Sequence, residues 1–218
     1  MKLYQYDHCP YCVRVKMLLG RKKFPYETIT IGYDDVQTPT NIIGKKLLPI
    51  LIKDDGTAMG ESLDIVKYLD NLDEKPILSH KKLPDNINAA LRILRQSANK
   101  LYKPRIVSVN INDFSTSAAV AYYENKWIKR NKINFDECLK QTETLLLEAQ
   151  AQLDIISSLL GDGKNIYNTM FSMADIHLFP VLRNLSVVKD LQLTDRLRAY
   201  MQYQAEQADL ELFFDQAM

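Results

Sequence analysis

The first 72 residues switch repeatedly between two periods of hydrophobic and polar positions. Alternation with a period of two, or a short apolar run beside a turn, predicts strands at residues 2–6, 26–31, 49–52 and 57–59. Apolar residues three and four positions apart predict helices at residues 12–20, 40–45 and 62–72. The last two strands flank an Asp-Asp-Gly turn, so we expect them to be antiparallel, whereas parallel neighbours need a crossover helix. The order β-α-β-α-β-β-α therefore predicts a small α/β domain with a mixed sheet.

The pattern changes after residue 72. Residues 73–85 hold two prolines and break the periodicity, and we interpret them as an interdomain linker. The remaining residues show helical periodicity, and helices are expected at residues 87–101, 139–160, 175–188 and 193–214. The predicted domains are an α/β domain over residues 1–72, a linker over 73–85 and an all-helical domain over 86–218.

One helix start in the second domain is specified in detail. Ser172 is followed three residues later by Asp175, which resembles a capping box with Asp in place of Glu or Gln. Phe171 and Ile176 stand where a hydrophobic staple would place them. A pattern this short also arises by chance, but the apolar run behind it favours a buried helix that begins here.

Charge and composition exclude several classes of partner. The 218 residues include 28 Lys and Arg against 27 Asp and Glu, without the basic excess expected of a protein that binds nucleic acid or an anionic membrane. The longest apolar run near the start, residues 47–52, is far shorter than the roughly 20 residues of a membrane-spanning helix. The first eight residues lack the apolar region of a signal peptide, so we expect a cytoplasmic protein. From the charge balance and the short apolar run, we expect it to bind neither nucleic acid nor membrane.

The candidate chemistry lies in Cys9-Pro10-Tyr11-Cys12, between the first strand and the first helix. A Cys-x-x-Cys pair in this position is typical of thioredoxin-like redox proteins. The free N–H groups and the dipole of a helix N-terminus favour an anion, so the Cys9 thiol is expected to have a depressed pKa. Pro10 suits the first helical turn because its missing N–H would have no partner there. We therefore predict that Cys9 is the nucleophile and that Cys12, one turn into the helix, is the resolving thiol.

Other roles for these thiols are less favoured. A structural zinc site needs about four ligands, and the third cysteine, Cys138, and the three histidines show no paired spacing. No metal is therefore expected. A purely structural pair of thiols is a further alternative. Cys138 lies in a helical stretch and is interpreted as a small buried hydrophobe. His8 either tunes Cys9 through a positive charge or is a neutral ring that faces solvent.

The sequence resembles a known family over nearly its full length. Cys-Pro-Tyr-Cys is typical of dithiol glutaredoxins, whereas thioredoxins usually have Gly-Pro between the cysteines. The whole chain resembles the large bacterial glutaredoxins, which have a glutathione-transferase-like architecture with a thioredoxin-like first domain. The stretches that carry the resemblance are residues 1–4, 7–12, 48–51, 61–66, 98–101, 113–116 and 175–185.

The resemblance implies a glutathione site. Pro49 matches the family's cis-proline, and the backbone of Leu48 would pair with the cysteinyl backbone of glutathione in the manner of a strand. Ser62 would offer its hydroxyl and N–H to the γ-glutamyl carboxylate, and Glu61 would meet the adjacent ammonium. Tyr11 would shape the pocket around the sulfur. The alternatives are an ordinary trans proline at position 49 and a plain helix cap at Glu61-Ser62, a role that is compatible with glutathione binding.

The lysine that binds the glycyl carboxylate stays open, and the sequence departs from small glutaredoxins at two places in this site. Lys45 or Lys46 would reach the glycyl carboxylate, although a solvated face is the commoner role for two such lysines. The chain departs from small glutaredoxins, which usually have Thr-Val before the proline and a Gly-Gly pair where residues 60–62 stand here. The backbone contact at Leu48 does not need a particular side chain, so we retain it.

The expected function is that of a glutathione-dependent thiol–disulfide oxidoreductase, which reduces glutathione mixed disulfides and protein disulfides. Glutathione is the reducing co-substrate, and no bound cofactor is expected. Two rival functions remain: a glutathione transferase that conjugates electrophiles, and a non-catalytic binding or iron–sulfur-sensing module that uses the same thiols. The resemblance also implies a monomer. Tyr122, Tyr123 and Trp127 would face a groove or pack in the core, and core packing is favoured.

Overall fold

The computed structural model describes residues 1–79, 81, 84–161, 164–167 and 170–218, and these form two compact units. Unit 1 comprises Met1–Pro76 and Asn110–Lys126, and unit 2 comprises Ile77–Val109 and Trp127–Met218. Residues 80, 82 and 83 of the expected linker lie outside the described residues. In the described part of the chain, no helix has the length and apolar character needed to cross a membrane.

Unit 1 contains the predicted mixed sheet, with strand order β2-β1-β3-β4. Its strands are β1 (Lys2–Gln5), β2 (Glu27–Thr30), β3 (Ile50–Ile52) and β4 (Ala58–Met59). β1 pairs with β2 in parallel, and the pairs β1–β3 and β3–β4 are antiparallel. The parallel pair is the one that has a helix between its strands, which is the connection that parallel strands require. The predicted order and the mixed character of the sheet are confirmed.

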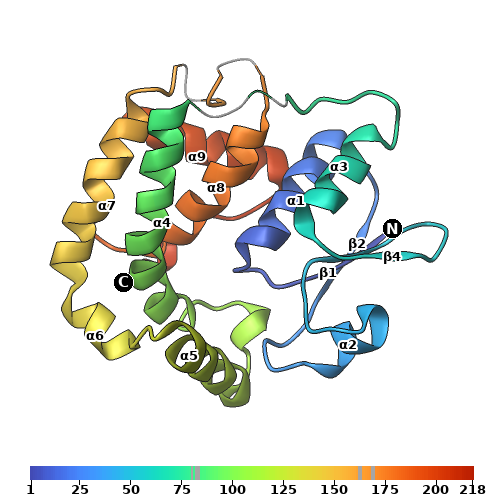
Figure 1. Ribbon diagram of the computed structural model, residues 1–218, viewed down its shortest axis with the longest axis horizontal. Coiled ribbons are helices and arrows are strands. Elements are labelled where there is room, and N and C mark those ends of the chain that lie inside the picture. The colour runs from blue at the N-terminus through green and yellow to red at the C-terminus, as the bar shows by residue number, and fades with distance from the viewer. Residues whose placement is uncertain (80, 82–83, 162–163, 168–169) are drawn as a thin grey trace. The chain divides into compact units, whose positions relative to one another are not determined.

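Three helices accompany the sheet: α1 (Pro10–Lys22), α2 (Gln37–Ile43) and α3 (Ser62–Asn71). α1 and α3 lie side by side on one face of the sheet, and α2 lies on the other side (Figure 1). The inner face of α1 buries Val15, Met17 and Leu18 completely, so the cysteine-bearing helix is fixed by the core. α2 begins at Gln37, before the predicted 40–45, and ends at Ile43 because Gly44 adopts a left-handed φ of 75° and terminates it.

A segment beyond the linker also belongs to unit 1. It contains the short helix η1 (Asn112–Phe114) and the first part of α5 (Ser117–Asn131). Asp113 is completely buried and Tyr123 nearly so, and Phe114 packs against the Tyr123 ring with centroids 5.0 Å apart. The sequence assigned this segment to the range of the helical domain and predicted no particular helix for it. Its aromatic side chains group it with the first domain's core instead.

Unit 2 is built from helices. They are α4 (Asp85–Ile106), α6 (Phe135–Lys140), α7 (Thr142–Ser157), α8 (Met173–Leu185), α9 (Asp195–Ala208) and the short helix η2 (Phe214–Gln216). α4 packs against α6, α7 and α8, and α8 packs against α9 (Figure 1). Figure 1 shows α4 and α7 side by side along much of their length.

Two predicted helices of unit 2 are wrong in extent. The single helix expected over residues 139–160 is two helices, α6 and α7, which meet at Gln141. Gln141 departs from helical backbone angles, with φ −94° and ψ 13°, and beside it the Thr142 hydroxyl donates to the Leu139 carbonyl at 2.7 Å. The helix expected over 193–214 ends at Ala208, because Asp209 is left-handed at φ 50°.

The predicted capping box at the start of α8 is confirmed. One Asp175 oxygen accepts the Ser172 backbone N–H at 2.9 Å and the Ser172 hydroxyl at 2.8 Å. The other oxygen accepts the Ile166 N–H at 2.9 Å and the Tyr200 hydroxyl at 3.2 Å. Burial raises the pKa of Asp175. This buried carboxylate therefore ties α8 to a neighbouring loop and to α9.

Candidate active site

Cys9 and Cys12 lie at the start of α1. Cys9 is the N-cap residue, with an extended ψ of 118°, and its carbonyl accepts the Val13 N–H at 3.0 Å. Pro10 begins the helix, where no intrahelical partner for an N–H is needed. All three cysteines are free thiols, and Cys9 is 8 % exposed whereas Cys12 is completely buried. Cys9 is therefore the thiol of the pair that borders solvent.

The two thiols differ in acidity. A hydrogen bond from the Cys12 thiol, the positive charge of His8 and the N–H groups of Cys12 and Tyr11 outweigh burial and lower the pKa of Cys9 from 9.0 to about 7. Burial and the hydrogen bond and charge of Cys9 raise the pKa of Cys12 well above 9.0. At neutral pH a large fraction of Cys9 is therefore thiolate, while Cys12 keeps its proton and stabilises that thiolate.

His8 is held by a residue that the sequence analysis did not select. Its ring nitrogen Nδ1 lies 2.6 Å from Oδ2 of Asp113, and its backbone N–H donates to the same oxygen at 2.9 Å. The ring is 5 % exposed, so the alternative of a solvent-facing His8 is wrong. Asp113 lies in one of the stretches that carry the family resemblance, which was the only signal in the sequence that pointed to it.

Aromatic rings surround His8. The ring centroids of Tyr33, Phe114 and Tyr123 lie 5.3, 5.0 and 5.3 Å from that of His8. Core packing is confirmed for Tyr123, which is 1 % exposed. Tyr122 is half-buried, with the Lys46 Nζ atom 3.7 Å from its ring centroid. Trp127 belongs to unit 2, where the Lys103 Nζ atom lies 3.9 Å from its ring centroid.

Leu48 and Pro49 form the turn into β3. The peptide bond between them is cis, as the family resemblance implied, and both residues are buried. Within the described residues, the backbone N–H and carbonyl of Leu48 make no hydrogen bond. Leu48 thus offers one donor and one acceptor to a peptide-like ligand.

Ser62 is the first residue of α3 and is 7 % exposed. Its hydroxyl accepts a long hydrogen bond of 3.4 Å from Nη1 of Arg14, whose guanidinium lies 4.8 Å from the Tyr11 ring centroid. This hydrogen bond brings the start of α3 to the first turns of α1. The N-cap position belongs to Glu61, and no side-chain capping bond forms, so the alternative of a plain Ser62 cap is wrong.

The two lysines of the loop before β3 have different surroundings. Lys45 forms an exposed ion pair with Glu61, with Nζ 3.2 Å from Oε1. Lys46 is half-buried and donates to the Tyr33 carbonyl at 2.5 Å. Lys46 is therefore engaged in unit 1's own packing, and Lys45 is the more accessible of the two cations.

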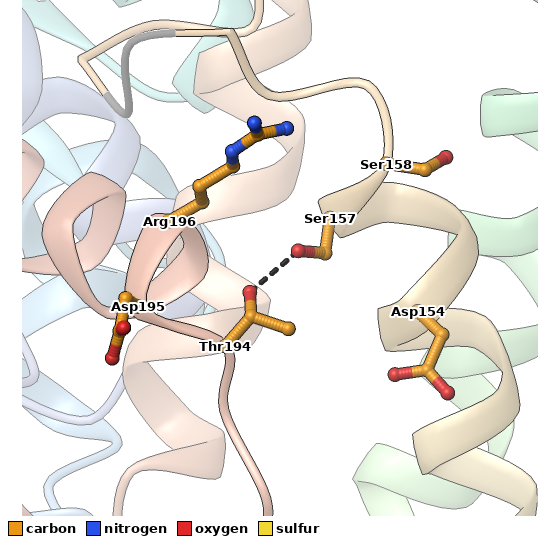
Figure 2. A pocket seen from close by; sticks show the side chains of 6 residues that line it. All are labelled: Asp154, Ser157, Ser158, Thr194, Asp195 and Arg196. Atoms are coloured by element: carbon orange, nitrogen blue, oxygen red, sulfur yellow. Dashed lines mark hydrogen bonds between the residues drawn. The ribbon is translucent and has the colours of Figure 1, made fainter.

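Two pockets in the described residues lie apart from the cysteines. One in unit 2 lies between α7 and the start of α9, and Figure 2 shows its lining residues, with the Ser157 and Thr194 hydroxyls 2.5 Å apart. A second lies along α3 and is lined by Asp64, Lys67, Tyr68, Asn71 and Leu72. A search of the same residues finds no group of three or more His, Cys, Asp or Glu side chains arranged to hold a metal ion.

The fold and the site define a thioredoxin-like thiol–disulfide oxidoreductase on a glutathione-transferase-like scaffold. The family model of the glutathione S-transferase N-terminal domain matches residues 3–76, and that of the glutaredoxin 2 C-terminal domain matches residues 86–217. The chain belongs to the glutaredoxin 2 family. Glutaredoxin 2 of Escherichia coli strain K12 is 39% identical over 218 residues, which is 100% of both chains.

Two solved structures place the fold. Glutaredoxin 2 of Salmonella typhimurium, crystallised in complex with glutathione, is 38% identical with a TM-score of 0.94, over 100% of this chain and 98% of that one. Glutathione transferase GSTFuA3 of Phanerochaete chrysosporium is 18% identical with a TM-score of 0.74, over 94% and 96% of the two chains. The second likeness concerns the fold alone.

Proposed function

We propose that this protein reduces glutathione mixed disulfides and protein disulfides at the expense of glutathione, with Cys9 as nucleophile and Cys12 as resolving thiol. The opposite pKa shifts of the two thiols support this assignment: the pKa of Cys9 is lowered to about 7, and the pKa of Cys12 is raised well above 9.0. A thiolate attacks a disulfide far faster than a thiol does, so the more acidic and less buried thiol attacks first.

Reduction of a protein disulfide takes two exchanges. The Cys9 thiolate bonds to one substrate sulfur, the substrate S–S bond breaks, and the departing sulfur takes up a proton. Cys12 then loses its proton and attacks the Cys9 sulfur, which releases the second substrate thiol and leaves a Cys9–Cys12 disulfide. The substrate has gained two electrons from the two cysteines and two protons, of which Cys12 releases one and the solvent supplies the other.

Glutathione restores the dithiol. One glutathione thiolate attacks the Cys9 sulfur and frees Cys12, and a second glutathione attacks the resulting mixed disulfide to give glutathione disulfide and the Cys9 thiolate. A glutathionylated substrate enters this cycle at the mixed disulfide and needs only Cys9. The reductant is the glutathione pool, and no bound cofactor takes part.

The proposed glutathione site joins three backbone and side-chain features. Leu48 offers the unpaired N–H and carbonyl that the cysteinyl backbone of glutathione needs. The N–H groups of the first α3 turn and the Ser62 hydroxyl suit the γ-glutamyl carboxylate. The ammonium group of glutathione would compete with Lys45 for Glu61. Tyr11, which is 53 % exposed, would border the sulfur atom of glutathione. The glutathione complex of the Salmonella typhimurium relative supports this site.

The cellular setting is part of the proposal. The partners are glutathionylated and disulfide-containing proteins. The protein acts in the cytoplasm, because a dithiol reductant depends on a reducing glutathione pool. The family resemblance implies that it acts as a monomer. We keep the proposed domains at residues 1–72 and 86–218, with the segment 110–126 contributing to the compact unit of the first.

A coupled assay tests the function. Glutathione, glutathione reductase and NADPH are supplied, and reduction of a small glutathione mixed disulfide is followed for the wild type, Cys9→Ser and Cys12→Ser, with Cys138→Ser as the control at a third buried thiol. We expect turnover to be lost in Cys9→Ser and kept in the other two variants, whereas reduction of a protein disulfide through the resolving thiol is lost in Cys12→Ser.

Two results would contradict the proposal. Turnover retained in Cys9→Ser would remove the nucleophile assignment. Absence of turnover in the wild type, together with rapid conjugation of glutathione to a chlorinated aromatic compound, would favour the glutathione transferase that the fold also suits.

A further inference from the structure

The carboxylate of Asp113 collects three hydrogen bonds from the two residues that precede Cys9. Oδ1 accepts the Asp7 N–H at 2.7 Å, and Oδ2 accepts the His8 N–H at 2.9 Å and contacts the His8 Nδ1 at 2.6 Å. Asp113 is completely buried and His8 is 5 % exposed. A buried carboxylate is stable only where donors and positive charge offset its lost hydration. Both partners of this interaction are therefore buried in unit 1.

Among the described residues, the carboxylate of Asp113 lies against the His8 ring. The packed neighbours on the other sides are the rings of Tyr6, Tyr33, Phe114 and Tyr123. Burial raises the pKa of Tyr6, so that phenol stays neutral. The ammonium groups of Lys46 and Lys126 each lie 5.2 Å from the Tyr33 ring centroid. Asp113 is therefore the carboxylate that pairs with the His8 ring, and Cys9 is the ionisable group that follows it in the chain.

We propose that Asp113 is a positioning residue that makes Cys9, rather than Cys12, the nucleophile. Asp113 fixes the His8 ring and the backbone that leads to Cys9, and its negative charge disfavours ionisation of Cys12. This rests on the proposed function. The charges act in opposite directions on the two thiols: that of His8 lowers the pKa of Cys9, and that of Asp113 raises the pKa of Cys12. The His8–Asp113 contact therefore adds to the difference in acidity between the two thiols.

The test is the pH profile of Cys9 alkylation by iodoacetamide, with the adduct located by mass spectrometry. Asp113→Asn is compared with Asp175→Asn, which changes another buried carboxylate that accepts two backbone N–H groups. We expect Asp113→Asn to raise the Cys9 midpoint by about one pH unit, which is roughly tenfold slower alkylation below the midpoint. We expect Asp175→Asn to lose stability without moving the midpoint. An unchanged midpoint in folded Asp113→Asn overturns the proposal.

A second variant covers the case in which Asp113→Asn does not fold. In His8→Gln the side-chain amide still donates to Asp113 but has no charge, and the two backbone hydrogen bonds remain. A raised Cys9 midpoint in His8→Gln supports the route through the imidazole, and an unchanged midpoint overturns it. Alkylation by iodoacetamide needs no glutathione, so the two proposals can fail separately. A wild type without turnover would contradict the proposed function, and the alkylation midpoints would still test the role of Asp113.

Discussion

The Nδ1 atom of His8 lies 2.6 Å from Oδ2 of Asp113, although the two residues are 105 positions apart in the chain. The contact joins the residue before the first cysteine to a segment that follows the expected linker. The His8 charge that it holds in place is one of the influences on the Cys9 thiol.

The pH dependence of Cys9 reactivity has a defined sign. Because the pKa of Cys9 is lowered to about 7, the fraction of Cys9 present as thiolate and its alkylation rate rise as the pH increases through 7 and fall as the pH decreases below it. The largest cause is the hydrogen bond from Cys12, so Cys12→Ala raises the midpoint towards 9.0 while Cys12→Ser, which keeps a donor, moves it much less. A midpoint unaffected by Cys12→Ala would exclude this hydrogen bond as the cause.

Ser62→Ala removes the hydroxyl proposed to bind the γ-glutamyl carboxylate. We expect the KM for glutathione to rise about tenfold or more with little change in kcat, since one hydrogen bond to a charged group contributes about 1.5–3 kcal/mol. Steady-state kinetics in the coupled assay measure both constants. Ser158→Ala, which removes an exposed hydroxyl that donates to the Ile155 carbonyl at 2.7 Å, is the matched control. Equal KM values in the two variants would remove Ser62 from the site.

Asp175→Ala deletes the acceptor of the capping box at α8. Its loss leaves the Ser172 and Ile166 N–H groups buried without their partner, which we expect to lower the free energy of unfolding by about 2–4 kcal/mol. Urea unfolding followed by circular dichroism measures the change. Asp154→Ala, on an exposed helix surface, should stay within about 0.5 kcal/mol of the wild type. Similar losses in both variants would show that burial of the carboxylate is not what stabilises α8.

Thr194 caps α9 and contacts α7 at once. Its hydroxyl oxygen accepts the Leu197 N–H at 3.2 Å and lies 2.5 Å from the Ser157 hydroxyl (Figure 2). Thr194→Ala should lower the free energy of unfolding by about 1–2 kcal/mol, and Thr194→Ser, which keeps the oxygen, should lose far less. Chemical denaturation of both variants checks this. Equal destabilisation would assign the effect to the lost methyl group and not to the hydroxyl.

Local patterns in the sequence determined the parts of the protein that depend on near neighbours in the chain. Alternation and helical spacing predicted the mixed sheet, because each strand places successive side chains on opposite faces. The Ser172–Asp175 spacing predicted the start of α8, because both partners lie within one helical turn. The position of Cys9 before Pro10 and a helix predicted its N-terminal placement on α1 for the same reason.

Only the tertiary structure decided the contacts between segments distant in the chain. Periodicity could not show that α6 and α7 separate at Gln141, since apolar residues continue on both sides of it. It could not bring Asp113 to His8, or Tyr123 to Tyr33, where the ring centroids lie 4.8 Å apart. Helical and strand periods report which face of an element is buried, whereas the partner of that face depends on how whole elements pack. The chemistry of Cys9 is therefore encoded locally, and the burial and charge that tune it come from the folded chain.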